Sequence, residues 1–282
     1  MILLCSGIHK KSIVRYDVIM QATIISVANQ KGGVGKTTST VNLARALVEA
    51  GKRVLVIDSD PQSSLSIVHG LDPRALRELD ATGKTFYFGL VKDAPLDSLV
   101  IDGAPSLIPA SIRLANAETE LVSPFGVATV LKEKIAVLRE SFDFILIDCP
   151  PTLSLLTVNA LTASNAVVIP CKTDYLSIMG IPLLMDTIEN VRRRANPGLK
   201  IIGILPTLFN ARAGHDAEAL QELRTSVAVK RVEVFDPVNR STAFDKANVE
   251  SKAALELFPE TPGIEQYKVV AQKIIELHAT QN

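Results

Sequence analysis

Short apolar runs, rich in Val, Ile and Leu, recur along the chain without alternating with polar residues. A strand that is covered on both faces of a sheet has this pattern, because neither face meets water. We therefore predict buried parallel strands at residues 23–28, 53–58, 144–148, 166–170, 201–207 and 232–236.

Apolar residues with helical spacing fill most of the intervals between these runs. In residues 37–50, Val41, Ala44 and Leu47 fall on one face, and Gly51 follows at the position where a helix ends. Strands that alternate with helices predict an α/β fold, a doubly wound and mostly parallel sheet with helices on both faces. The other predicted helices span residues 129–140, 154–163, 182–195, 214–228 and 264–278.

The chain shows no internal repeat, low-complexity tract or linker, although residues 70–125 are less regular than the rest. We therefore predict a single domain over residues 21–282. Residues 1–20 are predicted to be a peripheral or disordered extension that precedes a natural start at Met20.

Composition narrows the class of protein. Of 282 residues, 47% are hydrophobic and 21% are charged, which supports a sizeable core and excludes wholesale disorder. The 30 basic residues balance 30 acidic ones, so contact with nucleic acid would need a local basic patch. No apolar run approaches the ~18 residues of a membrane span. The cysteines, at positions 5, 149 and 171, show no metal-binding or disulfide spacing, which fits a cytoplasmic protein.

The segment QKGGVGKTT, residues 30–38, joins the first predicted strand to the first predicted helix. It departs from the common phosphate-loop pattern G-x-x-x-x-G-K-[ST], because Gln30 stands where the first glycine belongs and Lys31 precedes the glycines. Its glycines can adopt positive φ and turn backbone N–H groups inward, and the helix N-terminus behind them favours anions.

Two side chains at the start of this helix have defined phosphate chemistry. Lys36 would neutralise the charge of β- and γ-phosphates, and the Thr37 hydroxyl would ligate Mg²⁺. A glycine-rich turn without a ligand is the alternative. The strand, loop, GKT sequence and helix occur in register, which favours a phosphate-binding loop.

Three carboxylates stand at the ends of predicted strands. Asp58 and Asp60 lie at the end of the second run, and Asp148 ends the third. The carboxyl ends of parallel strands meet at the edge where doubly wound sheets bind ligands. Asp148 suits a residue that holds the metal through water, and Asp60 could orient or activate the attacking water. One strand-end aspartate is often only a cap or turn residue, but three at one edge favour a site.

Five segments together resemble the ParA/Soj branch of the deviant Walker ATPases, which partitions plasmids and chromosomes. The resemblance covers residues 22–277, in the family's order and without a large insertion. The segments are KGGVGKTT, VLVIDSDPQSSLS, LIPASIRLANAETELVS, FDFILIDCPPTLSLLTVNAL and GILPTLFNAR.

This resemblance implies that ATP and Mg²⁺ are the cofactors. It matches Lys31 to the signature lysine that reaches across an ATP-sandwich dimer to the partner's nucleotide, and Asp60 to the hydrolysis-critical aspartate. It implies catalytic roles for Lys31, Lys36 and Asp60, and metal-binding roles for Thr37, Asp60 and Asp148. The implied nucleotide-binding residues are Gly32, Gly33, Val34, Gly35, Lys36, Thr37, Thr38 and, near the adenine, Asn210 and Pro237.

The chain departs from the family at two places. PVNRSTAFDKANVES follows the sixth apolar run, where relatives often have IPRSVRLSEAPS near the nucleotide and the dimer surface. CKTDYLS replaces the usual acidic-aromatic stretch after the fourth run.

The resemblance implies a slow, partner-stimulated ATPase that acts in DNA partition. Its ATP-bound homodimer would bind double-stranded DNA of the nucleoid without sequence preference, and a ParB-like centromere-binding protein would stimulate hydrolysis. For the DNA contacts an alternative stays open, because a basic run at a helix C-terminus is commonly just solvated. The candidate DNA-binding residues are Arg192, Arg193, Arg194, Arg224, Lys230, Arg231, Lys246 and Lys252.

Related proteins with the same loop suggest other functions, chiefly a MinD-like positioning ATPase that acts on a membrane or a protein cargo. A membrane switch would need a basic amphipathic C-terminal helix with bulky anchors. The tail YKVVAQKIIELHATQN has no basic cluster and no Phe or Trp, so we predict a core-packing helix and no membrane contact. Cluster-assembly relatives would carry paired cysteines, and the larger repressor relatives a helix-turn-helix before the loop; the sequence shows neither.

Overall fold

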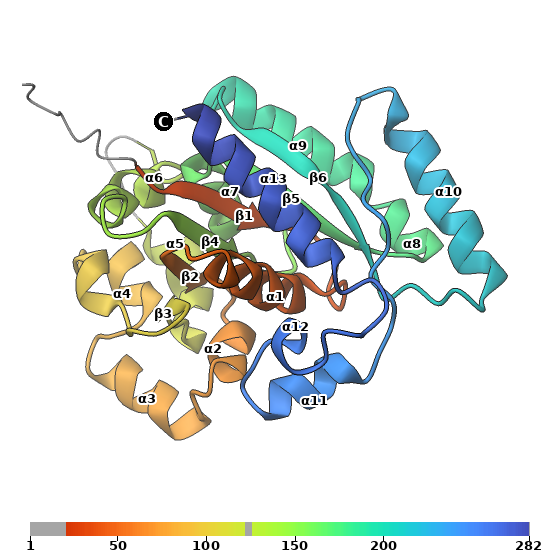
Figure 1. Ribbon diagram of the computed structural model, residues 1–282. Coiled ribbons are helices and arrows are strands. Elements are labelled where there is room, and N and C mark those ends of the chain that lie inside the picture. Colours follow the sequence, from red (N-terminus) through yellow and green to blue (C-terminus); the bar gives the residue numbers. More distant parts are fainter. Residues whose placement is uncertain (1–20, 122–125, 282) are drawn as a thin grey trace, which may run out of the picture.

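The computed structural model describes residues 21–121 and 126–281, which contain a parallel sheet of six strands between two layers of helices (Figure 1). The strand order is β3-β2-β4-β1-β5-β6, and every neighbouring pair is parallel. The predicted doubly wound α/β fold is therefore confirmed. The strands are β1 (Thr23–Val27), β2 (Val54–Asp58), β3 (Ser106–Ile108), β4 (Phe144–Asp148), β5 (Ala166–Lys172) and β6 (Lys200–Thr207).

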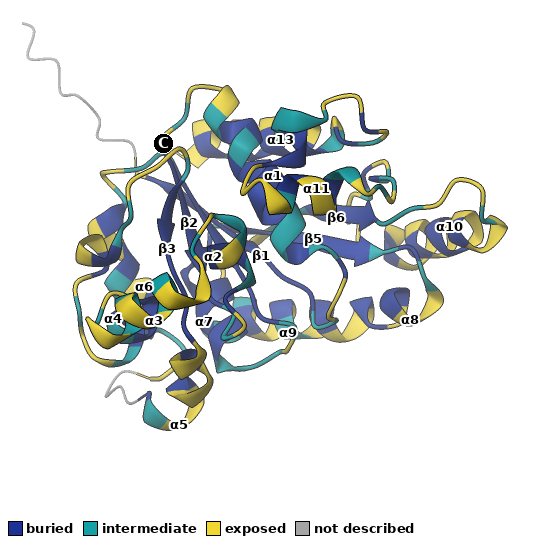
Figure 2. Ribbon diagram, turned by 90° about the horizontal axis from the view of Figure 1, so that it is seen from below, coloured by how far each residue is buried: buried dark blue, intermediate teal, exposed yellow. Residues whose placement is uncertain are grey.

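Each strand contributes to two hydrophobic cores, because successive side chains point to opposite faces of the sheet. In β1, Ile24 packs into one core and Ile25 into the other. Buried residues therefore fill the strands, while the exposed residues gather on the outer faces of the helices (Figure 2).

The two helix layers are unequal. Ile25 faces the smaller layer, which comprises α1 (Lys36–Glu49), α2 (Ser64–Val68), α11 (Ala243–Val249), α12 (Ala254–Leu257) and α13 (Gln266–Gln281). Ile24 faces the larger layer, which comprises α4 (Phe86–Val91), α5 (Ala117–Glu120), α6 (Val130–Lys134), α7 (Leu155–Ala163), α8 (Tyr175–Ile178), α9 (Ile181–Arg194), α10 (Gly214–Ala228) and the 3₁₀ turns η1 (Leu96–Leu99), η2 (Ile112–Asn116) and η3 (Ile135–Leu138). A peripheral helix, α3 (Pro73–Ala81), buries none of its residues.

The predicted strand at residues 232–236 is wrong. This segment pairs with β6 only around Ile204, whose N–H donates to Glu233 O at 2.8 Å and whose O accepts from Phe235 N at 3.0 Å. Pro206, two residues further along β6, has no N–H with which to continue the ladder. The sixth strand is instead β3, which lies in the stretch that we expected to be irregular and is only 3 residues long.

Most of the predicted helices are confirmed, and they appear as α1, α7, α9, α10 and α13. The helix predicted at residues 129–140 is interrupted, because α6 gives way to the 3₁₀ turn η3 at Ile135. The expected core-packing tail is confirmed, because Tyr267, Val270 and Ile274 of α13 are buried in the same core as α1.

Two further expectations concern a membrane span and residues 1–20. Within the described residues, no helix is both long enough and apolar enough to cross a membrane. The extension predicted at residues 1–20 lies outside the described residues, so it and the single-domain arrangement stay predictions.

Candidate functional site

The glycine-rich loop leaves β1 and ends at the first turn of α1. Gly33 has φ +70° and Gly35 has φ +80°. Residues with a Cβ rarely adopt this left-handed backbone conformation. Gly35 is the N-cap of α1, and the loop glycines and the first residues of α1 line the same space. That space is a cavity of about 360 Å³ whose lining includes the three loop glycines, Lys36, Thr37, Thr38 and Asp60.

A hydrogen bond from a side chain of β6 anchors the glycine-rich loop. The Thr207 hydroxyl donates to the carbonyl of Val34 at 2.8 Å, and both residues are buried. Val34 thus anchors the loop by its backbone and is not among the residues that line the cavity.

Lys36 is 7% exposed, and its ammonium donates to the carbonyl of Lys31 at 2.9 Å. Burial lowers the pKa of Lys36, while the carboxylates of Asp148 and Asp60 act in the opposite direction. A phosphate in the cavity would add negative charge beside this buried cation and so favour its charged form.

Asp148 lies beside the start of α1 because β4 is next to β1 in the sheet. The Thr37 hydroxyl donates to one carboxylate oxygen at 2.7 Å, and the Thr40 hydroxyl donates to the other at 3.2 Å. Burial, together with the charge of Asp58 on the neighbouring strand, raises the pKa of Asp148 to about 7. A cation bound beside this carboxylate would therefore offset the free-energy cost of burying its negative charge.

The oxygen atoms of Thr37 and Asp148 fit a magnesium ion, because Mg²⁺ prefers hard oxygen ligands and keeps several waters. No group of three or more His, Cys, Asp or Glu side chains that could hold a metal occurs in the part of the chain that the structure describes.

The two carboxylates at the end of β2 have different surroundings. Asp58 is fully buried and accepts hydrogen bonds from the backbone N–H and the hydroxyl of Ser66, at 2.8 and 2.6 Å. Burial raises its pKa to about 6. Asp60 lines the phosphate cavity, where its Oδ1 accepts from Gln62 N at 2.9 Å. The structure therefore brings Asp60 to the cavity and uses Asp58 to join β2 to α2.

Lys31 does not line the phosphate cavity of its own chain. Its backbone N–H donates to Asn29 Oδ1 at 3.0 Å. The neighbouring Gln30 donates its amide to the carbonyl of Gly180, between α8 and α9, at 2.8 Å. A Cβ at position 180 would come within 2.8 Å of Gln30 Nε2 and 3.7 Å of Lys31 Cε. The second lysine thus lies toward α8 and α9.

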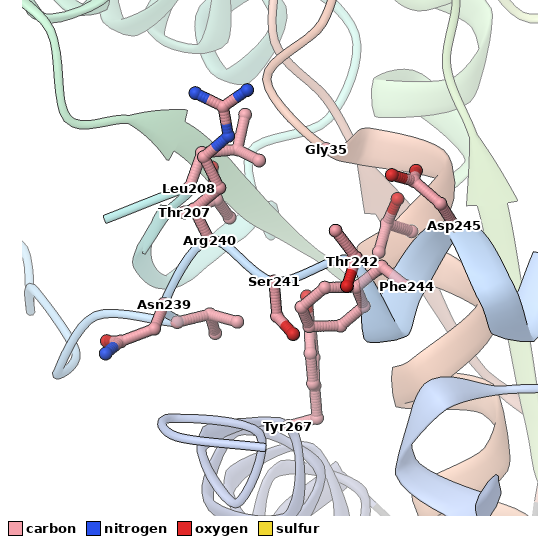
Figure 3. A pocket seen from close by; sticks show the side chains of 12 residues that line it. Gly35, Thr207, Leu208, Asn239, Arg240, Ser241, Thr242, Phe244, Asp245 and Tyr267 are labelled. Atoms are coloured by element: carbon pink, nitrogen blue, oxygen red, sulfur yellow. The ribbon is translucent and has the colours of Figure 1, made fainter. Parts of the chain in front are cut away.

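A second cavity, of about 400 Å³, shares Gly35, Thr38 and Leu208 with the first. Figure 3 shows that β6, the segment before α11 and the start of α13 surround it. The lining residues from the segment before α11, from α11 itself and from α13 are Val238, Asn239, Arg240, Ser241, Thr242, Phe244, Asp245 and Tyr267. A base and ribose attached to phosphates in the first cavity would extend into this one.

The contacts expected near the adenine, at Asn210 and Pro237, stay predictions. Neither residue is among those that line the second cavity. The Asn210 side chain instead accepts from Arg212 N at 3.1 Å. The signal that could have located the lining is the segment PVNRSTAF itself, which stood out as a departure from the family.

The candidate DNA-binding residues do not form one cluster. Arg192 donates to the carbonyl of Leu199 at 2.7 Å, and Arg224 forms an ion pair with Asp236 at 3.0 Å. One group lies in one helix layer, on α9, α10 and the turn that follows α10, and consists of Arg192, Arg193, Arg194, Arg224, Lys230 and Arg231. The other group lies in the opposite layer, on α11 and the turn before α12, and consists of Lys246 and Lys252. The structure therefore separates these residues into two groups.

Comparison with known proteins places residues 22–201 in a sequence family described as an AAA domain. The chain is 36% identical over 254 residues to the sporulation initiation inhibitor protein Soj of Bacillus subtilis, covering 89% of this chain and 97% of that protein. It is 37% identical over 253 residues to the chromosome-partitioning ATPase Soj of Thermus thermophilus, covering 89% of this chain and 94% of that protein.

A solved structure is also similar along most of its length. It is described as cobyrinic acid a,c-diamide synthase from Mycobacterium smegmatis with bound ADP and magnesium. The TM-score is 0.77 at 32% identity, covering 93% of this chain and 97% of that one. The overall fold of this chain is thus similar to that of a nucleotide-binding protein over most of both chains.

Proposed function

The chain belongs to the ParA/Soj family of P-loop ATPases, and from this premise we propose that it is an ATP-dependent dimerising ATPase for the partition of plasmid or chromosomal DNA. The observation that carries the proposal is the hydrogen bond between Thr37 on α1 and Asp148 on β4. It lies beside the glycine-rich loop, which contains the second lysine, Lys31.

The side chains of one subunit would bind and orient the nucleotide. The loop N–H groups would hold the phosphates, and the buried Lys36 would neutralise their charge. Thr37 and Asp148 would hold Mg²⁺, which neutralises developing charge on the β- and γ-phosphates when it is bound. Asp60 would orient the attacking water from the edge of the same cavity.

Lys31 would complete the site of a second subunit. Its side chain lies toward Gly180 and away from its own phosphate cavity, which supports a role across an interface. In the proposed cycle, the ATP-bound dimer binds double-stranded DNA of the nucleoid without sequence preference. A ParB-like centromere-binding protein then stimulates slow hydrolysis, and the dimer separates and releases the DNA.

An amide-transfer reaction, such as the name of the Mycobacterium smegmatis protein implies for that protein, has less support here. Transfer of an amide group commonly uses a reactive thiolate. Cys149 and Cys171 are both buried, and burial raises the pKa of each thiol, that of Cys171 to about 12. Neither described cysteine is therefore suited to act as a nucleophile.

The most direct test is a gel shift with arbitrary duplex DNA and Mg²⁺, with ATP compared against ADP. We expect a shift with ATP that weakens steeply as salt rises, because binding is through phosphates. DNA binding that is equally strong with ADP, or a chain that stays monomeric with ATP, would refute the cycle.

A further inference from the structure

We propose that Ser66 is a positioning residue for ATP hydrolysis, because its hydroxyl helps to hold Asp60 at the edge of the phosphate cavity. The proposal rests on the ATPase reaction proposed above and on the role of Asp60 in it. It adds to that site a residue that acts through Asp60 and does not itself line the cavity.

A single buried carboxylate, that of Asp58, closes the turn that carries Asp60. Its Oδ1 accepts the backbone N–H of Asp60 at 3.2 Å. Its Oδ2 accepts both the backbone N–H and the hydroxyl of Ser66, at 2.8 and 2.6 Å. Asp58 ends β2, which lies between β3 and β4 in the sheet. Both ends of residues 60–66 are therefore attached to one side chain on an interior strand.

The hydroxyl of Ser66 also joins this turn to the segment that follows β3. It accepts the backbone N–H of Ala110 at 3.0 Å while it donates to Asp58. Asp58, Ser66 and Ala110 are each 0% exposed, so water has no access with which to replace these hydrogen bonds. A serine hydroxyl can donate and accept at the same time, and here it uses both capacities to connect three segments of the chain.

The local structure makes the turn depend on this support. The helix α2 has only 5 residues, and the side chain of its N-cap, Ser63, makes no capping hydrogen bond to the described residues of the helix. Ser63 has φ +57°, in the left-handed region that residues with a Cβ rarely adopt. Asp58 takes the place of the missing cap, because it accepts the N–H of Ser66 in the first turn of α2. So short a helix has little stability of its own and needs such contacts.

The position of Asp60 matters for the rate of hydrolysis more than for binding. A displacement of about 1 Å in a group that orients a reactant can lower a rate about 100-fold. Binding of the phosphates would depend instead on the glycine-rich loop and Lys36, to which Ser66 makes no printed contact within the described residues. Loss of the Ser66 hydroxyl should therefore lower kcat and leave the affinity for ATP unchanged.

Steady-state phosphate release by the full chain, with Mg²⁺ and ATP, tests this role. We expect Ser66→Ala to lower kcat at least ~10-fold and to leave the KM for ATP within about twofold of the wild type. Ser66→Thr keeps the hydroxyl, so it should restore most of kcat.

Ser164→Ala is the matched control. Ser164 is also a buried serine with two partners, since it shares a hydrogen bond with the Ser26 hydroxyl at 2.7 Å and donates to the carbonyl of Ala160 at 2.8 Å. It precedes β5, at the edge of the sheet opposite the phosphate cavity. Its loss should change neither kcat nor KM, although it removes a buried hydroxyl in the same way.

Two further measurements keep the role testable if Ser66→Ala does not fold, which circular dichroism reveals. Asp58→Asn has one acceptor oxygen in place of two, so it cannot hold both Asp60 and Ser66, and it should lower kcat without raising KM. In the wild type, amide hydrogen exchange followed by NMR should show the N–H groups of Asp60, Ser66 and Ala110 protected.

The outcomes separate this role from the proposed function. A wild-type chain that releases no phosphate from ATP refutes the proposed ATPase and the role of Ser66 with it. In an active wild type, a folded Ser66→Ala variant with unchanged kcat overturns the role of Ser66 alone. An equal loss of kcat in Ser66→Thr assigns the effect to packing and overturns the role of the hydroxyl, as does free exchange of the Asp60 and Ala110 amides.

Discussion

Replacing Asp148 by Asn should stabilise the nucleotide-free protein while it weakens magnesium-dependent binding. The Asp148 carboxylate is buried at the end of β4, and burial raises its pKa from 3.8 to about 7. An asparagine has the same shape but no charge, and the hydroxyls of Thr37 and Thr40 can still hydrogen-bond to it.

The magnitude follows from linkage between protonation and folding. The folded pKa lies above the unfolded one, so the folded state binds the proton more tightly, and wild-type stability falls as the pH rises from about 4 to about 7. At about 1.4 kcal/mol for each pH unit, the charge destabilises the fold by roughly 4 kcal/mol above pH 7. Asp148→Asn should therefore raise the free energy of unfolding by up to that amount at pH 8, by roughly 40% of it at pH 5, and only slightly below pH 4.

Urea unfolding, followed by far-ultraviolet circular dichroism at pH 4, 5, 6, 7 and 8 without nucleotide or metal, measures this effect. Asp60→Asn is the matched control, because Asp60 is half-buried and its change should leave the free energy of unfolding nearly constant. In the second arm, Asp148→Asn should lose most of the gain in ATP affinity that Mg²⁺ confers. A pH-independent effect, or no stabilisation at pH 8, would refute the argument that the buried charge destabilises the fold.

Other variants test the remaining roles. Lys31→Ala should still bind ATP through Lys36 but fail to release phosphate, and wild-type hydrolysis would contradict the role of Lys31. Asp60→Ala should accumulate an ATP-bound dimer on DNA in gel shifts, whereas hydrolysis at the wild-type rate would contradict its role. Gly35→Ala should lower the melting temperature by a few degrees and ATP affinity at least ~10-fold, because φ +80° costs about 1–2 kcal/mol with a Cβ; unchanged affinity in calorimetry would exclude strain in the loop. Glutamates at residues 192–194 should weaken binding to all DNA sequences and flatten its salt dependence, and unchanged binding would remove this run from the DNA contacts.

The phosphate loop could be predicted from sequence because its parts are contiguous. The apolar strand, the glycines and the helix with Lys36 and Thr37 at its start follow one another within residues 23–50. Asp148 could be predicted as well, since an acidic residue that ends a buried strand must emerge at the carboxyl edge of a parallel sheet.

Other features depend on contacts that local patterns do not encode. The segment 232–236 has the composition of a strand, but Pro206 on β6 interrupts the partner that it would need. The second cavity combines β6, the segment before α11 and Tyr267 of α13, which lie far apart in the sequence. Periodicity describes what one segment prefers, and it carries no information about which segment lies beside it.

The sequence by itself determined the alternation of strands and helices, the phosphate loop and the presence of a second lysine. Only the tertiary structure decided how these parts meet. Because β1 lies between β4 and β5, Asp148 comes to Thr37 on one side, and Gly180 comes to Gln30 on the other. The position of Lys31 against α8 and α9 thus arises from strand order, which depends on packing across the whole sheet rather than on any single segment.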